Sequence, residues 1–196
     1  MIEKLKKIVN ELSIEENSEE LPKHVWGFKN QRERLNQVCE LALQNYQGDI
    51  LEIGAHRGLT TKIFCELAKK YDRKVVVLDN WCGEQQGDEI IYQSFKKNTE
   101  KYNDLLDANR VSSFSEEGKN IIQNNNFAFC WIDGLHTYEA CRQDIDSCST
   151  QEGILAVDDL SWIADLKRLF FEKQKEFNFE YYYNENCREG YYITKK

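Results

Sequence analysis

The sequence predicts an α/β fold in three layers, with helices on both faces of a mostly parallel seven-stranded sheet that ends in an antiparallel hairpin. From residue 49 to about residue 176, short apolar runs alternate with helical stretches. These apolar runs are nearly continuous, which is typical of parallel strands buried on both faces. The tail differs, because two aromatic-rich runs separated by a polar turn with Gly190 predict a closing antiparallel pair.

The helices and strands are expected in a regular order. Apolar residues spaced three and four apart predict helices at residues 1–12 and about 31–46, on either side of an acidic loop that ends at Pro22. Strands are expected at residues 49–54, 74–79, 110–114, 127–133 and 153–159. Helices are expected between and after them, at residues 59–71, 88–103, 116–123, 138–148 and 161–176. The closing pair is expected over residues 177–186 and 190–195.

Length and composition predict one domain. A chain of 196 residues can bury a full core without disulfide or metal staples. We expect residues 1–47 to form a helical cap and residues 48–196 to form the core. The mean hydropathy of −0.69 argues against a membrane-spanning segment. The first residues do not resemble a signal peptide.

The charge and the cysteine content indicate which kinds of binding partner and which compartment to expect. The net charge of −8 argues against a phosphate backbone as the main partner, so a small-molecule substrate is expected. The seven cysteines are scattered and include no C-x-x-C pair, which argues against both a disulfide framework and a zinc site. A reducing cytoplasm is the expected compartment.

A glycine turn follows the first predicted core strand, in the segment DILEIGAHRG. Gly54 and Gly58 bracket the turn, and Asp79 follows Gly58 by 21 residues (79 − 58 = 21) at the end of the next strand. An acid at this spacing is placed to accept hydrogen bonds from ribose hydroxyls. The G-x-x-x-G spacing lacks the pattern of dinucleotide sites, so a different adenosine ligand is indicated. A tight turn without a ligand, and an aspartate that only caps a loop, are the alternatives.

Acidic residues also end the fourth and fifth core strands. Asp133 ends one of these strands and is followed by His136, and Asp158 and Asp159 end the other. Carboxyl ends of parallel strands meet at one edge of the sheet, and three uncompensated carboxylates there would repel one another. A bound Mg²⁺, Mn²⁺ or Ca²⁺ would explain them, because oxygen ligands suit these ions. Alternatively, Asp159 only caps the next helix.

The segments EIGAHRG, VVVLDNW, WIDGLHTY and AVDD together resemble class I S-adenosylmethionine-dependent methyltransferases, over roughly residues 48–162. Within that class the resemblance is to the small Mg²⁺-dependent O-methyltransferases of the macrolide-sugar and catechol types. It implies a Rossmann-like fold and metal ligands at Asp133, Asp158 and Asp159. The catechol type has Asn at the last of these positions, so this chain resembles the sugar type more. The implied cofactor-binding residues are Glu52, Gly54, Ala55, Gly58, Asp79, Asn80, Trp81, Phe114, Ser115 and Asp133.

The resemblance also implies a mechanism. The protein would place a substrate hydroxyl in line with the methyl group of the cofactor, and metal chelation would lower the pKa of that hydroxyl. His136 is the expected base, beside Asp133 at the catalytic centre; the alternative is that it only orients an aspartate or caps a helix. His56 and Arg57 are candidates to contact the cofactor carboxylate, or are simply exposed. Four aromatic residues are candidates to wall the pockets or to pack in the core: Trp26, Phe28, Trp81 and Trp162.

Three rival functions stay open. The first is a metal-independent O- or N-methyltransferase, and the second is a non-catalytic protein that binds the cofactor. The third, an NAD-dependent oxidoreductase, lacks a Tyr-x-x-x-Lys pair, since Arg142 follows Tyr138 and Val75 follows Tyr71 at that spacing. The sequence does not identify the methyl acceptor, because loops diverge freely on a shared scaffold. The N-terminal helices and the aromatic tail could form the face of a homodimer.

Overall fold

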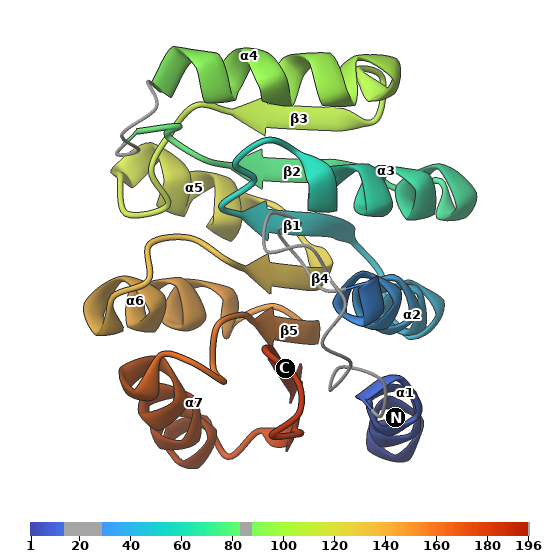
Figure 1. Ribbon diagram of the computed structural model, residues 1–196, viewed down its shortest axis with the longest axis vertical. Coiled ribbons are helices and arrows are strands. Elements are labelled where there is room, and N and C mark those ends of the chain that lie inside the picture. Colours follow the sequence, from blue (N-terminus) through green and yellow to red (C-terminus); the bar gives the residue numbers. More distant parts are fainter. Residues whose placement is uncertain (14–28, 83–87, 196) are drawn as a thin grey trace.

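A computed structural model of the protein describes residues 1–13, 29–82 and 88–195. Seven strands form one sheet in the order β3-β2-β1-β4-β5-β7-β6 (Figure 1). β1 to β5 run parallel, and β7 pairs antiparallel with both β5 and β6. The strands are β1 (Asp49–Ile53), β2 (Val75–Leu78), β3 (Leu106–Asn109), β4 (Phe127–Ile132), β5 (Gly153–Val157), β6 (Glu180–Tyr183) and β7 (Gly190–Thr194). The predicted sheet and its antiparallel C-terminal pair are confirmed.

Two layers of helices cover this sheet. One layer is α1 (Ile2–Ser13), α2 (Lys29–Asn45), α3 (Leu59–Tyr71) and α4 (Asp88–Thr99), the last followed by the short 3₁₀ helix η1 (Glu100–Tyr102). The other layer is α5 (Glu116–Asn124), α6 (Tyr138–Cys148) and α7 (Ala164–Phe177).

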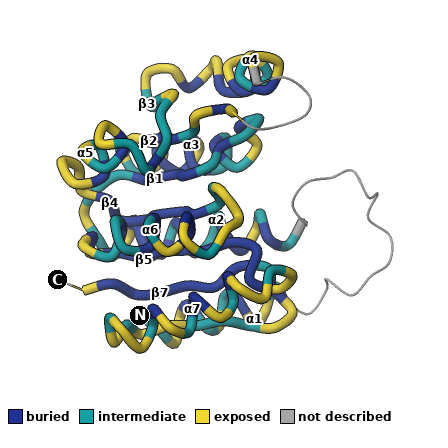
Figure 2. Tube along the Cα trace, turned by 90° about the vertical axis from the view of Figure 1, so that its left-hand side faces the viewer, coloured by how far each residue is buried: buried dark blue, intermediate teal, exposed yellow. Residues whose placement is uncertain are grey.

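Successive side chains along each strand pack alternately into the two halves of the core, on opposite faces of the sheet. In β2, Val75 and Val77 pack with the first helical layer, and Val76 and Leu78 pack with the second. Figure 2 shows the buried strands as a dark blue band between helices whose outer faces are exposed. This double coverage explains why the strand sequences are continuously apolar.

Several boundaries differ from the prediction, and two of these differences have a clear physical reason. β3 lies at residues 106–109 rather than 110–114, and its residues are only half-buried or exposed because β3 is the edge strand. An edge strand lacks the apolar run that marks a central one, so its position is poorly signalled. The start of α7 also shifts, from the predicted residue 161 to Ala164, because the preceding Ile163 has an extended backbone.

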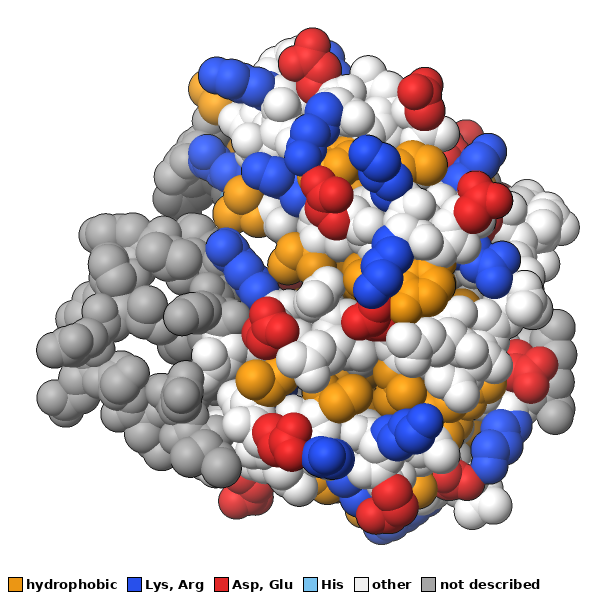
Figure 3. Space-filling view, turned by 90° about the vertical axis from the view of Figure 1, so that its right-hand side faces the viewer, with side chains coloured by type: hydrophobic (Ala, Val, Ile, Leu, Met, Phe, Trp, Pro, Cys, Tyr) orange, Lys and Arg blue, Asp and Glu red, His pale blue; other side chains and the backbone are white. Residues whose placement is uncertain are grey.

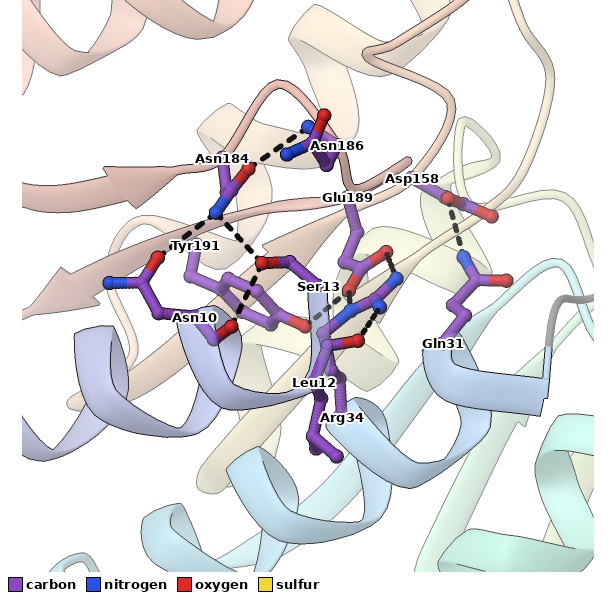
Figure 4. Close-up of polar contacts among 10 residues, drawn as sticks. All are labelled: Asn10, Leu12, Ser13, Gln31, Arg34, Asp158, Asn184, Asn186, Glu189 and Tyr191. Carbon is purple, nitrogen blue, oxygen red and sulfur yellow. Dashed lines mark hydrogen bonds and ion pairs between the residues drawn. The ribbon is translucent and has the colours of Figure 1, made fainter. Parts of the chain in front are cut away.

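A buried ion pair ties the N-terminal helices to the last strand (Figure 4). Arg34 of α2 meets Glu189, which precedes β7, through Nε–Oε1 at 2.6 Å and Nη2–Oε2 at 3.2 Å. Both side chains are fully buried. Arg34 Nη1 also donates to the carbonyl of Leu12 in α1 at 3.1 Å, and the Tyr191 hydroxyl donates to Glu189 Oε1 at 2.8 Å. The cap is therefore joined to the core by specific polar contacts.

The side of the molecule away from the carboxyl ends of the parallel strands carries mixed charge. Figure 3 shows Lys and Arg side chains there, interspersed with Asp and Glu. Among the described helices, none is both long and apolar enough to cross a membrane.

Candidate functional site

The glycine turn after β1 is shaped by the packing of the chain itself. Gly54 has a φ of 87°, and a Cβ at this position would lie 2.0 Å from the carbonyl oxygen of Asp133, which follows β4. Gly58 has a φ of 76°, and a Cβ there would lie 2.9 Å from the ring of Phe95 in α4. Both positions therefore require glycine. The turn consequently lies directly against the acidic end of β4.

Asp79 at the end of β2 fastens this turn. Its Oδ2 accepts hydrogen bonds from the backbone N–H groups of Ala55 and His56, both at 2.8 Å, and its Oδ1 accepts one from the N–H of Trp81 at 2.6 Å. A carboxylate offers about four acceptor positions, so about one remains for a ligand hydroxyl. The predicted ribose acid thus also holds the turn in place.

Glu52 of β1 is fully buried beneath the turn. Its Oε2 accepts a hydrogen bond from the Thr61 hydroxyl at 2.6 Å, whereas its Oε1 has no hydrogen-bond partner within the described segments. Burial raises the pKa of Glu52 to about 8, although the Thr61 hydrogen bond acts to lower it. A buried carboxyl oxygen without a partner is costly, and a cationic amino group of a ligand would satisfy it. This orphaned oxygen fits a cofactor that carries such a group.

The other predicted cofactor residues surround the turn and the end of β3. Trp81 is 3% exposed, packs on the rings of Tyr92 and Phe95, and donates its indole N–H to the His56 carbonyl at 2.7 Å. Asn80 is exposed, Phe114 is half-buried, and Ser115 caps α5 by accepting a hydrogen bond from the Gly118 N–H. Trp81 therefore stabilises the turn through packing, and its contact with a cofactor stays a prediction.

A cluster of two carboxylates and an imidazole lies where β4 and β5 end. His136 Nε2 is 2.8 Å from Asp159 Oδ2 and 3.5 Å from Asp133 Oδ1. Hydrogen bonds to Asp133 and Asp159 raise the pKa of His136 to about 10, so the imidazole is protonated at neutral pH in this arrangement. A protonated imidazole cannot accept a proton. The predicted role of His136 as a base therefore requires that it first lose this proton.

Arg188, in the loop between β6 and β7, is a site residue that was not predicted from the sequence. Its guanidinium forms an ion pair with Asp159 and lies 3.5 Å from Asp158 Oδ2. It also lies over the ring of Trp162, whose indole N–H donates to Asp159 Oδ1 at 2.6 Å. Burial alone would raise the pKa of Asp159, but His136 and Arg188 hold it below its usual range. Asp159 adopts a left-handed φ of 66°, a strained backbone of the kind that clusters at functional sites.

Asp158 has a hydrogen-bond partner from outside this cluster. Its Oδ1 accepts a hydrogen bond from Nε2 of Gln31, at the start of α2, at 2.8 Å (Figure 4). The side chain is buried, and burial raises the pKa of Asp158 well above its usual range, as does the nearby charge of Asp133. Gln31, like Arg188, was not among the predicted site residues.

The premise of three uncompensated carboxylates is therefore wrong. Arg188 and the protonated His136 supply positive charge among Asp133, Asp158 and Asp159. The sequence could not show this, because Arg188 follows Asp159 by 29 residues and only the pairing of β7 with β5 brings it back.

A divalent ion fits part of the predicted ligand set. Ligand atoms of Asp133, His136 and Asp159 lie within 4.8 Å of one another and could hold a metal ion. Asp158 is outside this group and would have to leave Gln31 and Arg188 to join it. The positions of these ligand atoms therefore support a metal site formed by two carboxylates and one imidazole, rather than by three carboxylates.

Two apolar side chains stand exposed beside the cluster. Leu135 and Trp162 each expose 62% of their surface, and the Trp162 and His136 rings lie 6.2 Å apart. Trp26 and Phe28, proposed from the sequence as pocket walls, lie outside the described residues, as does most of the loop from Trp81 to Glu89.

Comparison with known proteins agrees with this geometry. Residues 51–160 match the model of a family described as a methyltransferase domain. That segment is more than half of the chain and contains the glycine turn, Asp79, Asp133 and the two aspartates after β5. No curated protein matches the sequence.

Several solved structures share the fold. The methyltransferase PaMTH1 of Podospora anserina, bound to SAH, is 11% identical with a TM-score of 0.65, over 99% of this chain and 96% of that one. An O-methyltransferase from Bacillus cereus in complex with SAH is 14% identical with a TM-score of 0.63, over 98% and 91%. CalS11, a TDP-rhamnose 3′-O-methyltransferase of calicheamicin biosynthesis, is 14% identical with a TM-score of 0.63, over 100% and 94%.

Proposed function

Because this chain belongs to the methyltransferase-domain family and shares its fold with O-methyltransferases, we propose that it methylates a hydroxyl of a small molecule, with S-adenosylmethionine as the donor. The observation that carries this proposal is the contact between the glycine turn and the acidic cluster. Gly54 lies against the backbone of Asp133, so a cofactor on the turn places its reactive end beside Asp133 and His136.

The cofactor half of the proposal rests on two acids. The orphaned Oε1 of Glu52 is the expected partner for the amino group of the cofactor, and Asp79 has an acceptor position left for a ribose hydroxyl. Ala55 and Gly58 shape the turn between them, while Phe114 and Ser115 are expected to border the adenine. These roles follow from charge, burial and position along the carboxyl edge of the sheet.

For the acceptor, we propose a hydroxylated sugar or another natural-product intermediate. The exposed ring of Trp162 offers a surface for such a molecule beside His136 and Asp159. Aromatic rings of this kind pack against the apolar faces of ligands. The structural similarity to CalS11, a TDP-rhamnose 3′-O-methyltransferase, supports a sugar acceptor.

In the metal-assisted form of this reaction, Asp133, Asp159 and His136 would hold Mg²⁺, Mn²⁺ or Ca²⁺, with Asp158 as a further ligand after rearrangement. The ion would lower the pKa of the acceptor hydroxyl and favour its alkoxide. In that form His136 is a ligand or an orienting group, and Asp133 faces the reacting hydroxyl.

A second candidate mechanism needs no metal, and the position of Arg188 favours it. Its guanidinium already balances Asp159 and Asp158. In this form His136, once deprotonated, removes the proton from the acceptor, and Arg188 stabilises the carboxylates around it. Both forms give the same product, so an assay distinguishes them by their need for an ion.

One assay tests the function and separates the two forms. The protein is incubated with S-adenosylmethionine carrying a radiolabelled methyl group, and with panels of nucleotide sugars, catechols and amines. We expect label on an oxygen of a hydroxylated compound, loss of transfer in Asp133→Asn, and retention in the surface control Glu139→Gln. Label on amines alone would contradict the proposal. Turnover lost on chelation and restored by Mg²⁺ supports the metal-assisted form, and turnover unaffected by chelation supports the other.

We also propose a reducing cytoplasm as the location, which the seven free cysteines support. A homodimer through the N-terminal helices and the aromatic tail is a further proposal, to be tested by sedimentation.

A further inference from the structure

One cation contacts both aspartates that follow β5. Arg188 Nη2 forms an ion pair with Asp159 Oδ1 and lies 3.5 Å from Asp158 Oδ2. The side chains of Asp159 and Asp158 are only 1% and 5% exposed, and that of Arg188 is 21% exposed. Because little water screens charges at such buried positions, the guanidinium attracts both carboxylates strongly. Arg188 therefore supplies the positive charge that a metal ion would otherwise bring to this edge of the sheet.

The other two oxygens of this pair of carboxylates have partners as well. Asp158 Oδ1 accepts a hydrogen bond from Gln31 Nε2 at 2.8 Å, and Asp159 Oδ2 lies 2.8 Å from His136 Nε2. Each of the four carboxylate oxygens therefore faces a hydrogen-bond donor or a cation. An ion that bound Asp158 and Asp159 would have to take the place of partners that the chain already provides.

The backbone around Arg188 is fixed by the fold. Its carbonyl accepts a hydrogen bond from the N–H of Leu160 at 2.7 Å, and Leu160 directly follows Asp159. The next residue after Arg188 is Glu189, which is fully buried in its ion pair with Arg34 of α2 at 2.6 Å. Contacts of the neighbouring residues thus keep the guanidinium at the aspartates, in addition to the contacts of the guanidinium itself.

A divalent ion and the guanidinium would repel each other at the same carboxylate. Mg²⁺ binds carboxylate oxygens directly, at about 2.0–2.1 Å, so an ion on Asp159 would bring a second positive charge close to Arg188. We propose that Arg188 competes with divalent ions for Asp158 and Asp159, and so keeps the affinity of this site for metal low. The inference rests on the proposed function for the reaction at this site, and it favours the form of that reaction that needs no metal.

Binding of Mn²⁺ alone to the full chain tests this competition without cofactor or methyl acceptor. Electron paramagnetic resonance would measure the free ion during a titration. The wild type should bind Mn²⁺ with a Kd of about 1 mM or weaker, and Arg188→Gln should bind it at least about tenfold more tightly. The control is Arg168→Gln, which removes the same charge from an exposed position on α7, where Arg168 Nη2 lies 3.3 Å from Asp165. This control should bind Mn²⁺ as weakly as the wild type.

Equal Mn²⁺ affinity in the wild type and Arg188→Gln would overturn the inference, as would a micromolar Kd for the wild type. An equal gain in Arg168→Gln would also overturn it, because the effect would then come from net charge alone. Failure of the proposed function gives a different result. If S-adenosylhomocysteine does not bind the wild type, the methyltransferase proposal fails, whereas the comparison of Mn²⁺ affinities does not involve the cofactor.

A second variant covers the case in which Arg188→Gln does not fold. The double variant Asp158→Asn with Arg188→Gln removes the cation together with one of the acids that it balances, and it keeps an acceptor for Gln31. It should bind Mn²⁺ at least about tenfold more tightly than Asp158→Asn alone, because Asp159 loses its competing cation. Equal affinity in these two proteins would contradict the competition.

Discussion

The buried pair of Arg34 and Glu189 should contribute strongly to the stability of the fold. The substitution Glu189→Gln keeps the shape of the side chain and an acceptor for the Tyr191 hydroxyl, but removes the charge that faces the guanidinium. Arg34 then remains as a fully buried cation that has lost its carboxylate partner and still donates to the Leu12 carbonyl at 3.1 Å. Removing one partner of a buried ion pair is costly because the remaining charge is left desolvated.

The expected cost is about 3–5 kcal/mol in the free energy of unfolding. For a domain of this size, each kcal/mol lowers Tm by about 2–4 °C, so the Tm of Glu189→Gln should fall by roughly 6–20 °C. The exposed pair of Lys6 and Glu3 provides the control, since Glu3→Gln should change stability by less than about 1 kcal/mol.

Urea denaturation followed by circular dichroism would measure these values. The double variant Arg34→Met with Glu189→Gln should be more stable than Glu189→Gln alone, because it no longer buries a guanidinium that has lost its carboxylate. If Glu189→Gln unfolded within 1 kcal/mol of the wild type, the assignment of Arg34 as a buried, desolvated cation would be wrong.

Three further predictions concern the site. The pKa of Glu52 is about 8 in the folded state and about 4.5 in the unfolded state. The stability of the wild type relative to Glu52→Gln should therefore fall as the pH rises between these values, by at most about 1.4 kcal/mol per pH unit. Parallel pH profiles of the two proteins would contradict this. In NMR titrations without metal, the His136 imidazole should titrate near 10, and Asp159→Asn should move it toward 6.5. The stabilisation from the His136 contacts is then fully present below pH 6.5 and lost as the pH rises through about 10; a wild-type value near 6.5 would rule out these contacts. Trp162→Ala should raise the KM for the acceptor about tenfold while leaving the Kd of S-adenosylhomocysteine unchanged, and an equal loss in both would place Trp162 in the cofactor pocket instead.

The scaffold could be predicted from the sequence because its signals are local. Continuous apolar runs marked the central strands, and the resemblance to class I S-adenosylmethionine-dependent methyltransferases is confirmed by the family match over residues 51–160. β3 was misplaced because an edge strand such as Leu106–Asn109 buries little and needs no apolar pattern.

The charge balance of the site could not be predicted in the same way. Asp158 and Asp159 were visible at a strand end, but two of their partners come from distant parts of the chain. Gln31 reaches Asp158 across 127 residues, and Arg188 reaches Asp159 across 29. Neither residue follows a core strand of the parallel sheet, so no periodicity or motif marks it. The three-dimensional structure is needed to show that cations already stand among these acids.

Binding of the cofactor product decides whether the carboxyl edge of the sheet is a methyltransferase site. Calorimetry with S-adenosylhomocysteine should show one site per chain with a micromolar Kd, and Asp79→Ala should weaken it at least tenfold, because Asp79 both holds the turn and faces the ribose. The control Asp107→Ala, an exposed acid on β3, should leave the Kd unchanged. Absence of binding to the folded wild-type protein at millimolar ligand would contradict the assignment of this edge as a cofactor site.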